Sequence, residues 1–495
     1  MTAADQQHRR PPHVLVVTHP AQGHLNPALQ FSTRLAALGC RVTLVTTVSG
    51  HRRIASYSLP EGLTVSTFSD GYDDGVGSSS SSSKSSQADD QTQQWANFVT
   101  RGSQFVRELI ASNAEGGKPF ARLVYTLLLT WAMEAAREEN LPATLLWIQP
   151  ATVLDIYYYF VNGYEKIIFD GCKDPSFVVE LPGVHVSFTS KDLPSFLVPS
   201  NPYPAVLKVM KDQIKVLSSF TEEDRPKVLV NTFDALEPDA LRALEGKLDM
   251  VGIGPLVPSS FLESNISSTT SNVGSEYMTW LDSQATSSVV YVSFGTMAVL
   301  SRRQREEVGK ALLCSGRSFL WTLRKEPENE EESRWREEME KEAEECGGMI
   351  VEWCSQVDVL SHPAVGCFLS HCGWNSALES MCLGVPTVGF PQFSDQQTNA
   401  KLVEDVWRTG VRVVVPENDG GGDDGGGGGG TAVGAVVEGE EIRRCLDLVM
   451  GEGEVGEEVR RNPKKWKELA RSAAGEGGTS HVNLKGFVDE IASYS

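Results

Sequence analysis

The residues of this sequence best suited to chemistry lie between Trp353 and Gln396. Indole, imidazole, amide, hydroxyl and carboxylate groups occur here where apolar runs of strand length give way to runs of helical length. An aromatic face can stack on a base, carboxylates can accept from sugar hydroxyls, and N–H and O–H donors can bind phosphate oxygens. These residue types indicate a site for a nucleotide joined to a sugar.

A strand-like run ends at His371, and a helical run follows it. We expect Asn375 or Ser376 to cap this helix, because short polar side chains bond the first N–H groups. The start of the helix would then attract a phosphate, and His371 can donate to the same oxygens. Glu379, one turn into the helix, would reach the ribose hydroxyls.

Two further positions complete the predicted site. Trp353 ends the preceding strand and offers a flat face to a base, and Asp395 with Gln396 can bracket the hydroxyls of a hexose. Taken singly, Trp353 is more typical of a core, His371 of a structural histidine and Asp395 of a helix cap. The joint pattern favours the site.

The elements that must position these residues form two series. Near-continuous apolar strands alternating with helices predict an α/β fold with two doubly wound parallel sheets, whose ligands lie at the carboxyl ends of the strands. The expected strands are 13–18, 41–48, 63–68, 123–128, 143–148 and 228–233 in the first series, and 288–295, 318–324, 348–353, 366–371, 386–390 and 411–415 in the second.

The predicted organisation is an N-terminal acceptor-binding domain (1–256), a linker (257–275), a C-terminal donor-binding domain (276–475) and a last helix (476–495) that packs back on the first domain. The Ser-rich stretch 77–90 and the Gly-rich stretch 419–430 are expected to be surface loops, because they carry too little apolar surface to order themselves. The Gly-rich stretch lacks the Lys-Ser/Thr that follows a phosphate loop.

Composition excludes several classes of protein. With 44 basic and 65 acidic residues the net charge is −21, the opposite of a nucleic-acid or anionic-membrane binder. Nine scattered cysteines without a CxxC pair predict neither a disulfide framework nor a zinc site. The polar N-terminus has no signal core, and no run is long enough to span a membrane. We expect a cytoplasmic protein.

The segment Trp353–Gln396 closely resembles the plant secondary-product glycosyltransferase box of the UDP-dependent family-one glycosyltransferases. The match includes W-x-x-Q, HCGWNS, ALES, GVP and the closing D-Q. Resemblance continues in PAQGHLNPALQF (20–31), GPL (254–256), WLDSQ (280–284) and VVYVSFGT (289–296). Within this family the chain most resembles the branch with anthocyanin 5-O-glucosyltransferases, crocetin glucosyltransferases and hormone glucosyltransferases. This narrower resemblance rests on SDGYDDG, VYTLLLTWA and LLWIQPATVLDIYYYF.

The resemblance implies a GT-B fold, two Rossmann-like domains facing a cleft, and inverting transfer of glucose from UDP-glucose to a small acceptor by a monomer. Trp353 would stack on uracil, the Cys354 backbone and Gln356 would hold the base or ribose, and Glu379 the ribose hydroxyls. The remaining donor residues would be Thr296, His371, Gly373, Asn375 and Ser376 at the diphosphate, and Trp374, Asp395 and Gln396 at the sugar. Gln396 at the last box position goes with glucose. No Asp-x-Asp motif occurs, so no metal or other cofactor is expected.

The resemblance makes His24 the general base, a task that suits an imidazole. Many relatives carry an Asp that orients this histidine, and here Thr126 takes that place. A hydroxyl can accept a hydrogen bond from the ring but cannot offset an imidazolium charge. Either another carboxylate substitutes, or the base is weaker. A weaker base would suffice for an acidic acceptor, which is either a carboxylic acid, such as an apocarotenoid acid or a hormone acid, or an acidic phenol, such as a flavonoid or anthocyanin.

The acceptor pocket is expected around Gln149, Asp155–Phe160 and Leu193–Tyr203, whose aromatic residues suit flat apolar acceptors. Two other functions stay open. A nucleotide-dependent oxidoreductase would need GxGxxG after the first strand, and PAQGHLNP lacks that spacing. A non-catalytic UDP-sugar-binding protein has only Thr126 in its favour.

Overall fold

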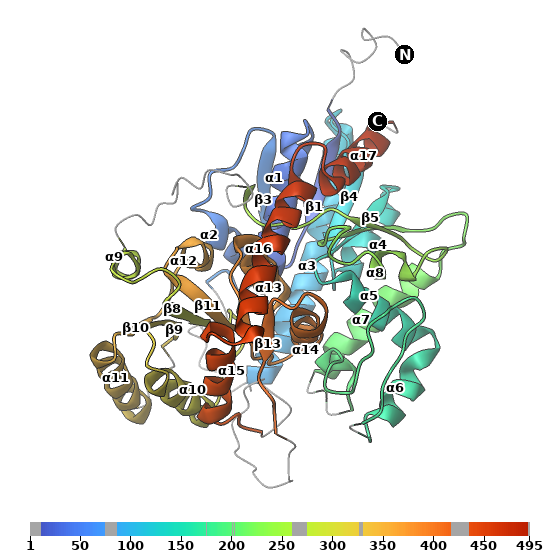
Figure 1. Cartoon of the computed structure of the whole chain (residues 1–495). Coiled ribbons are helices and arrows are strands. Elements are labelled where there is room, and N and C mark those ends of the chain that lie inside the picture. Colours follow the sequence, from blue (N-terminus) through green and yellow to red (C-terminus); the bar gives the residue numbers. More distant parts are fainter. Residues whose placement is uncertain are drawn as a thin grey trace. The chain divides into compact units, whose positions relative to one another are not determined.

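A computed structural model describes residues 11–74, 87–174, 176–199, 201, 203–259, 275–325, 330–416 and 435–493 (Figure 1). The chain forms two compact units that interleave along the sequence. Unit 1 comprises residues 1–161, 205–257 and 473–495, and unit 2 comprises 162–204 and 258–472. Most of the Ser-rich stretch, the whole Gly-rich stretch and most of the predicted linker lie outside the described residues.

Unit 1 is built on a parallel sheet whose inner strands are buried on both faces, as their apolar sequences require. From β1 the chain adds β2 and β3 toward one edge of the sheet. It then returns to place β4 on the other side of β1 and continues toward the opposite edge, so the order of the strands reverses between β1 and β4. In spatial order the strands are β3 (Leu63–Phe68), β2 (Arg41–Thr47), β1 (His13–Val17), β4 (Arg122–Thr126), β5 (Ala143–Trp147), β6 (Lys227–Val230) and β7 (Asp249–Gly252).

The helices of unit 1 cover its sheet, and the last helix of the chain returns to it. In α17 the buried residues Leu484, Phe487 and Ile491 recur at helical spacing, and its Glu490 pairs with Arg122 at 3.1 Å. The helices are α1 (Gln22–Ala37), α2 (Val48–Ile54), α3 (Gln87–Glu115), α4 (Thr130–Glu138), α5 (Ala151–Tyr159), α7 (Pro204–Ser218), α8 (Ala240–Ala243) and α17 (Thr479–Ser493).

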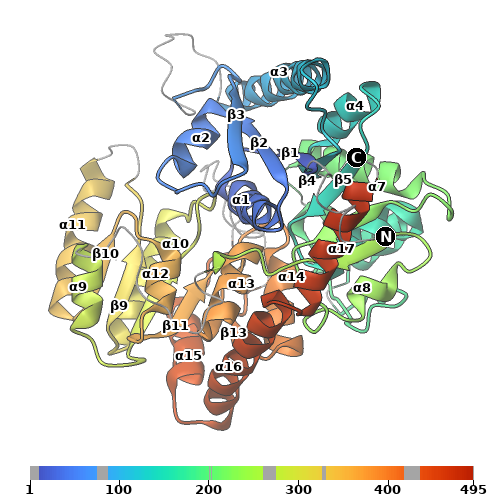
Figure 2. The ribbon, with the colours of Figure 1, turned by 90° about the horizontal axis from the view of Figure 1, so that it is seen from above.

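Unit 2 contains the second parallel sheet, with helices on both faces (Figure 2). Alternate residues of one strand serve separate cores: Val290 and Val292 pack in one cluster, and Val289 and Tyr291 in the other. The strand order is β10 (Met349–Val351), β9 (Phe319–Thr322), β8 (Val289–Ser293), β11 (Val365–Ser370), β12 (Thr387–Gly389) and β13 (Gly410–Arg412).

The helices of unit 2 follow the strands in the expected alternation. Helices α10 and α15 pack together in one core, and α12 and α13 contact each other in the other. The elements are η2 (Phe160–Tyr164), α6 (Glu165–Gly171), η3 (Ser195–Leu197), α9 (Glu276–Asp282), α10 (Arg302–Cys314), α11 (Glu330–Glu345), α12 (Gln356–Ser361), α13 (Trp374–Leu383), α14 (Gln396–Lys401), η5 (Leu402–Val406), α15 (Gly439–Met450) and α16 (Glu454–Ala474).

The structure differs from the sequence prediction at two helix starts and one strand. The sequence predicts that the helix after the first strand begins near Pro27, but this helix begins at Gln22, and Pro27 lies inside it and is buried. Helix α13 is capped by Gly373, so Asn375 and Ser376 are not its caps but lie in its first turn. Strand β7 was not predicted, because its four residues, DMVG, are too few to show a period.

Among the described residues, no helix combines the length and the apolar character that crossing a bilayer requires.

Candidate active site

In unit 2 the predicted donor residues gather at the carboxyl ends of neighbouring strands. Thr296 follows β8, His371 follows β11, and Asp395 with Gln396 follows β12, and these three strands are adjacent in the sheet. Trp353 follows β10, the strand at one edge of the same sheet. Parallel pairing therefore brings residues that are far apart in sequence together at the carboxyl ends of the strands, where doubly wound folds bind nucleotides.

A tight turn between β11 and α13 brings a helix start to this edge. Cys372 has a φ of +59°, an uncommon conformation for a residue with a side chain, and Gly373 then caps the helix. The first turn of an α-helix directs N–H groups along its axis, and here the residues at that position are Trp374, Asn375 and Ser376. The arrangement suits an anion such as a diphosphate.

Trp374 is 4 % exposed, and its indole packs against Trp407 with ring centroids 5.6 Å apart. The indole is thus part of the core of unit 2. Any contact of this residue with a sugar would be made through its backbone.

The imidazole of His371 fits between two glycines. A Cβ at Gly295 or at Gly373 would lie 2.6 Å from its Nε2, so neither position has room for a side chain. Gly295 also has a φ of +72°, in the region that favours glycine. Burial lowers the pKa of His371 to about 4, so the ring is neutral at neutral pH and acts through hydrogen bonding rather than charge.

Gln356, Ser376 and Glu379 form one hydrogen-bonded group. The amide of Gln356 donates to Ser376 Oγ at 2.8 Å and to Glu379 Oε2 at 2.7 Å. Burial raises the pKa of Glu379 to about 7, although the Gln356 bond opposes this. The Gln356 side chain therefore joins α12 to α13 and orients the carboxylate predicted to hold the ribose.

Trp353 is 62 % exposed, which rules out the alternative that its indole belongs to the core. Beside it Cys354 is buried, and its Sγ contacts Tyr291 Oη at 3.4 Å and Thr322 Oγ1 at 3.2 Å. Only the backbone of Cys354 is placed to meet a ligand, as the resemblance implies.

The loop before α14 has a defined internal geometry. Gln396 Oε1 accepts from the N–H groups of Gln392 at 2.9 Å and Phe393 at 3.2 Å, so its NH2 group is the part suited to a ligand. Asn399, which no sequence motif indicates, donates both to Asp395 Oδ2 at 2.7 Å and to the carbonyl of Cys372 at 2.9 Å. One buried amide thus connects the predicted sugar loop to the turn before α13.

In unit 1, His24 lies near the start of α1, facing the end of β4. Its Nδ1 is 3.4 Å from Thr126 Oγ1, and Thr126 Oγ1 is 3.4 Å from Thr18 Oγ1. Within the described residues, His24 has no hydrogen bond or ion pair to a carboxylate. The hydroxyl of Thr126, at the position where the resemblance would put an aspartate, thus lies next to the His24 ring.

Burial lowers the pKa of His24 to about 4. The ring centroid of the neighbouring His19 lies 5.3 Å away. Burial, followed by the electrostatic effects of His24 and Arg53, lowers the pKa of His19 to about 3. His19 accepts from the N–H of Ala21 at 3.1 Å and packs edge-on against Phe98, so it supports the loop rather than competing as a base.

Gln149, the predicted acceptor residue, follows β5 and is 9 % exposed. Its Oε1 is buried and has no hydrogen-bond partner within the described residues. A buried acceptor without a partner suits a ligand that can donate to it. Among the described residues no cluster of His, Cys, Asp or Glu could hold a metal ion.

A family model described as "UDP-glucoronosyl and UDP-glucosyl transferase" matches residues 250–417. The chain is 48 % identical to a phloretin 4'-O-glucosyltransferase of Malus domestica over 98 % of both chains. It is 49 % identical to a chloroplastic crocetin glucosyltransferase of Gardenia jasminoides, covering 97 % of each. Among solved structures, Os79 of O. sativa, crystallised with a trichothecene, is 34 % identical with a TM-score of 0.77, covering 97 % of this chain and 100 % of that one.

Two parallel α/β sheets, with a helix start, carboxylates and an exposed indole at the carboxyl ends of the strands of one of them, suit a transferase that uses a nucleotide sugar. With nearly full-length identity to curated glucosyltransferases, the chain belongs to the plant UDP-dependent family-one glycosyltransferases and has their GT-B fold. The predicted family, fold class and UDP-glucose-dependent glycosyltransferase activity are thus confirmed, and the oxidoreductase alternative is wrong.

Proposed function

We propose that the protein transfers glucose, with inversion, from UDP-glucose to an acidic hydroxyl or a carboxyl group of a small apolar or aromatic plant metabolite. The observation that carries the acceptor side of this proposal is the His24–Thr126 contact. A general base with a lowered pKa and a hydroxyl partner is suited to an acceptor that gives up its proton readily.

On the donor side, each residue type matches one part of UDP-glucose. The exposed Trp353 suits uracil, Glu379 held by Gln356 suits the ribose hydroxyls, and the start of α13 suits the diphosphate. The leaving UDP gains negative charge as the anomeric bond breaks, and N–H donors already in place stabilise that charge. We therefore expect the donor to react without a divalent ion.

On the acceptor side, the pKa of His24 limits which protons it can remove. At neutral pH the imidazole is neutral and can accept a proton, but burial without a carboxylate disfavours the imidazolium that results. A carboxylic acid, with a pKa of about 4, arrives ionised and needs no base. A phenol, with a pKa of about 10, needs less help than an alcohol.

The proposal is tested with His24→Ala on a carboxylate, a phenol and an aliphatic alcohol of similar size, with UDP release as the readout. We expect a loss of about 10²- to 10⁴-fold on the phenol and the alcohol, the usual size of general-base catalysis. The carboxylate should lose much less. Equal fractional losses on all three acceptors would contradict the proposal.

Thr126→Asp provides the matched gain of function. A carboxylate at 126 would stabilise the imidazolium of His24 and should raise turnover of the alcohol relative to the carboxylate. Thr126→Val, which has the same shape without the hydroxyl, is the control and should not raise it. If Thr126→Asp leaves the alcohol-to-carboxylate ratio unchanged, the partner of His24 does not set acceptor acidity.

A further inference from the structure

The segment 189–203 is bonded to the loop 391–396, which carries Asp395 and Gln396, although nearly two hundred residues separate them in the sequence. Both belong to unit 2. The aromatic residues of Leu193–Tyr203 indicate only a place in the acceptor pocket. The structure gives part of this segment a second task, which follows from three sets of contacts.

The first contact is a reciprocal pair between Ser195 and Ser394. The N–H of Ser195 donates to the carbonyl of Ser394 at 2.8 Å, and the N–H of Ser394 donates to Ser195 Oγ at 2.7 Å. Ser394 has a φ of +66°, a conformation that an L-residue adopts only when its surroundings compensate for the strain. Ser394 immediately precedes Asp395, so its backbone sets the direction of that side chain.

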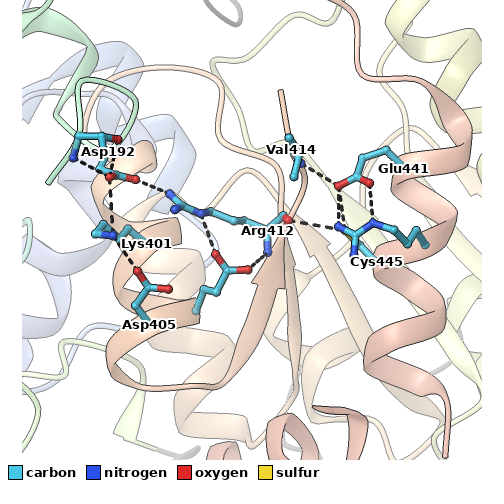
Figure 3. Close-up of polar contacts among 10 residues, drawn as sticks. Asp192, Lys401, Asp405, Arg412, Val414, Glu441 and Cys445 are labelled. Carbon is cyan, nitrogen blue, oxygen red and sulfur yellow. Dashed lines mark hydrogen bonds and ion pairs between the residues drawn. The ribbon is translucent and has the colours of Figure 1, made fainter. Parts of the chain in front are cut away.

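The second contact is an ion pair made by the buried carboxylate of Asp192. Asp192 Oδ1 lies 2.5 Å from Arg412 Nη1, and Asp192 Oδ2 lies 3.6 Å from Lys401 Nζ and accepts from Thr189 (Figure 3). The Asp192 side chain is 2 % exposed, so all its bonds are made inside the protein. Arg412 is held in turn by Glu404 at 2.7 Å.

The third contact ties the segment to the helix that begins at Gln396. Thr398, fully buried in α14, donates to the backbone carbonyl of Asp192 at 2.7 Å. Tyr203 adds an aromatic contact with Phe393, with ring centroids 6.4 Å apart. The loop 391–396 is thus supported from one side by its own helix and from the other by residues of 189–203.

From these contacts we infer that Ser195 and Asp192 are positioning residues for the donor sugar, which set sugar selectivity by fixing the loop that carries Asp395 and Gln396. The inference rests on the proposed role of those two residues at the sugar. Neither Ser195 nor Asp192 needs to touch the substrate. Because discrimination between glucose and galactose depends on the direction of single hydroxyls, a small displacement of the loop weakens it.

The test compares Ser195→Ala with Ser315→Ala. Ser315 is also half-buried in unit 2 and also accepts from a backbone N–H, that of Arg317 at 3.2 Å, but it lies after α10 and away from the loop. For Ser195→Ala we expect KM for UDP-glucose to rise about five- to tenfold, the effect of one lost hydrogen bond. The kcat/KM ratio of UDP-glucose to UDP-galactose should fall by a similar factor. Inhibition by UDP should be unchanged, because UDP lacks the sugar.

Three further results make the test decisive. Ser195→Thr, which keeps the hydroxyl, should restore selectivity, and Asp192→Asn should lower it in the same direction as Ser195→Ala. Unchanged selectivity in Ser195→Ala, or a parallel weakening of UDP and UDP-glucose, would overturn the inference. Asp395→Asn separates the two proposals. If this variant keeps its sugar selectivity, the proposed sugar site is wrong. If selectivity is lost in Asp395→Asn but kept in Ser195→Ala and Asp192→Asn, only the positioning role is wrong.

Discussion

At the scale of single residues, the histidines next to the predicted substrates are neutral. Burial lowers the pKa of both His24 and His371 to about 4, well below the ordinary 6.5. A neutral His24 can accept a proton, and a neutral His371 can donate one hydrogen bond to a phosphate without a net charge. Each protonation state suits the role proposed for the residue.

The pKa of His24 predicts the acid limb of the pH profile. Because the folded pKa is lowered to about 4, the base form persists as pH falls through 6.5 and is lost only near pH 4. At saturating UDP-glucose, kcat/KM for a phenolic acceptor should therefore stay level between about pH 5 and 7 and fall below that range. Tryptophan fluorescence at each pH controls for acid unfolding, and an acid limb centred near 6.5 would contradict this assignment.

Glu379 predicts a pH-dependent affinity for the nucleoside. Its pKa of about 7 means that the carboxylate, the better acceptor for ribose hydroxyls, forms as pH rises through neutrality. Uridine has no titrating phosphate, and its inhibition constant should fall several-fold from pH 6 to 8, because one pKa unit is worth about 1.4 kcal/mol. Glu379→Gln should abolish this dependence, and an equal dependence in that variant would assign it to another group.

At the scale of elements, the site depends on the turns that follow the strands. The turn after β8 and the turn after β11 both place glycine against the ring of His371, and Asn399 of α14 bonds the second turn to Asp395. The end of each strand sets the direction of the side chain that follows it, and contacts between the turns set the distances between these side chains.

Gly295→Ala tests this dependence. The new Cβ would meet His371 Nε2 at 2.6 Å and would also occupy a φ of +72°. Gly316→Ala is the control, since Gly316 has a φ of +66° but nothing within 4 Å of a built Cβ. Backbone strain should cost both variants about 1–2 kcal/mol of stability in urea unfolding, and the contact with His371 should add to this loss in Gly295→Ala. Only Gly295→Ala should lose kcat/KM, by about 10²-fold if the ring shifts by about 1 Å.

Equal kcat/KM in the two glycine variants would show that His371 does not depend on the turn after β8.

At the scale of the whole molecule, the chain crosses between its two units more than once. Residues 162–204 leave unit 1 for unit 2, and residues 473–495 return to unit 1. The first of these segments brings Ser195 and Asp192 into unit 2. The second places α17 on unit 1, where its apolar face is buried and Glu490 meets Arg122.

The packing of α17 predicts unequal effects of two nearby substitutions. Phe487 is 2 % exposed, and Phe487→Ala should destabilise unit 1 by about 3–5 kcal/mol. Glu490→Ala removes two partly exposed ion pairs, with Arg122 and Lys227, and should cost only about 0–1 kcal/mol for each. Urea unfolding followed by tryptophan fluorescence measures both, and a larger effect at Glu490 would show that charge rather than burial holds the helix.

Metal independence is a prediction for the whole enzyme. If the start of α13 and His371 stabilise the leaving diphosphate, glucosyl transfer should keep nearly all its rate in excess EDTA. Added Mg²⁺ should not restore or raise it by more than about twofold. Loss of nearly all activity in EDTA, recovered with a divalent ion, would contradict the prediction.

The sequence alone determined the family, the two parallel sheets and the residue types of the donor segment. It could do so because apolar strands, turn glycines and the Trp353–Gln396 box are local patterns, readable without knowing what lies beside them. It misplaced the start of α13, since Gly373 caps the helix where a polar side chain was expected. It also missed β7, because four residues carry too little periodicity.

Only the tertiary structure decided which distant residues meet. His24 lies 3.4 Å from Thr126, Asn399 donates two hydrogen bonds, and Ser195 pairs with Ser394. These contacts join positions up to about two hundred residues apart. Residue types can show that a histidine, a carboxylate or an amide is present. The partner of each group, and with it the pKa and direction of the side chain, depends on burial and on neighbours that the fold brings together.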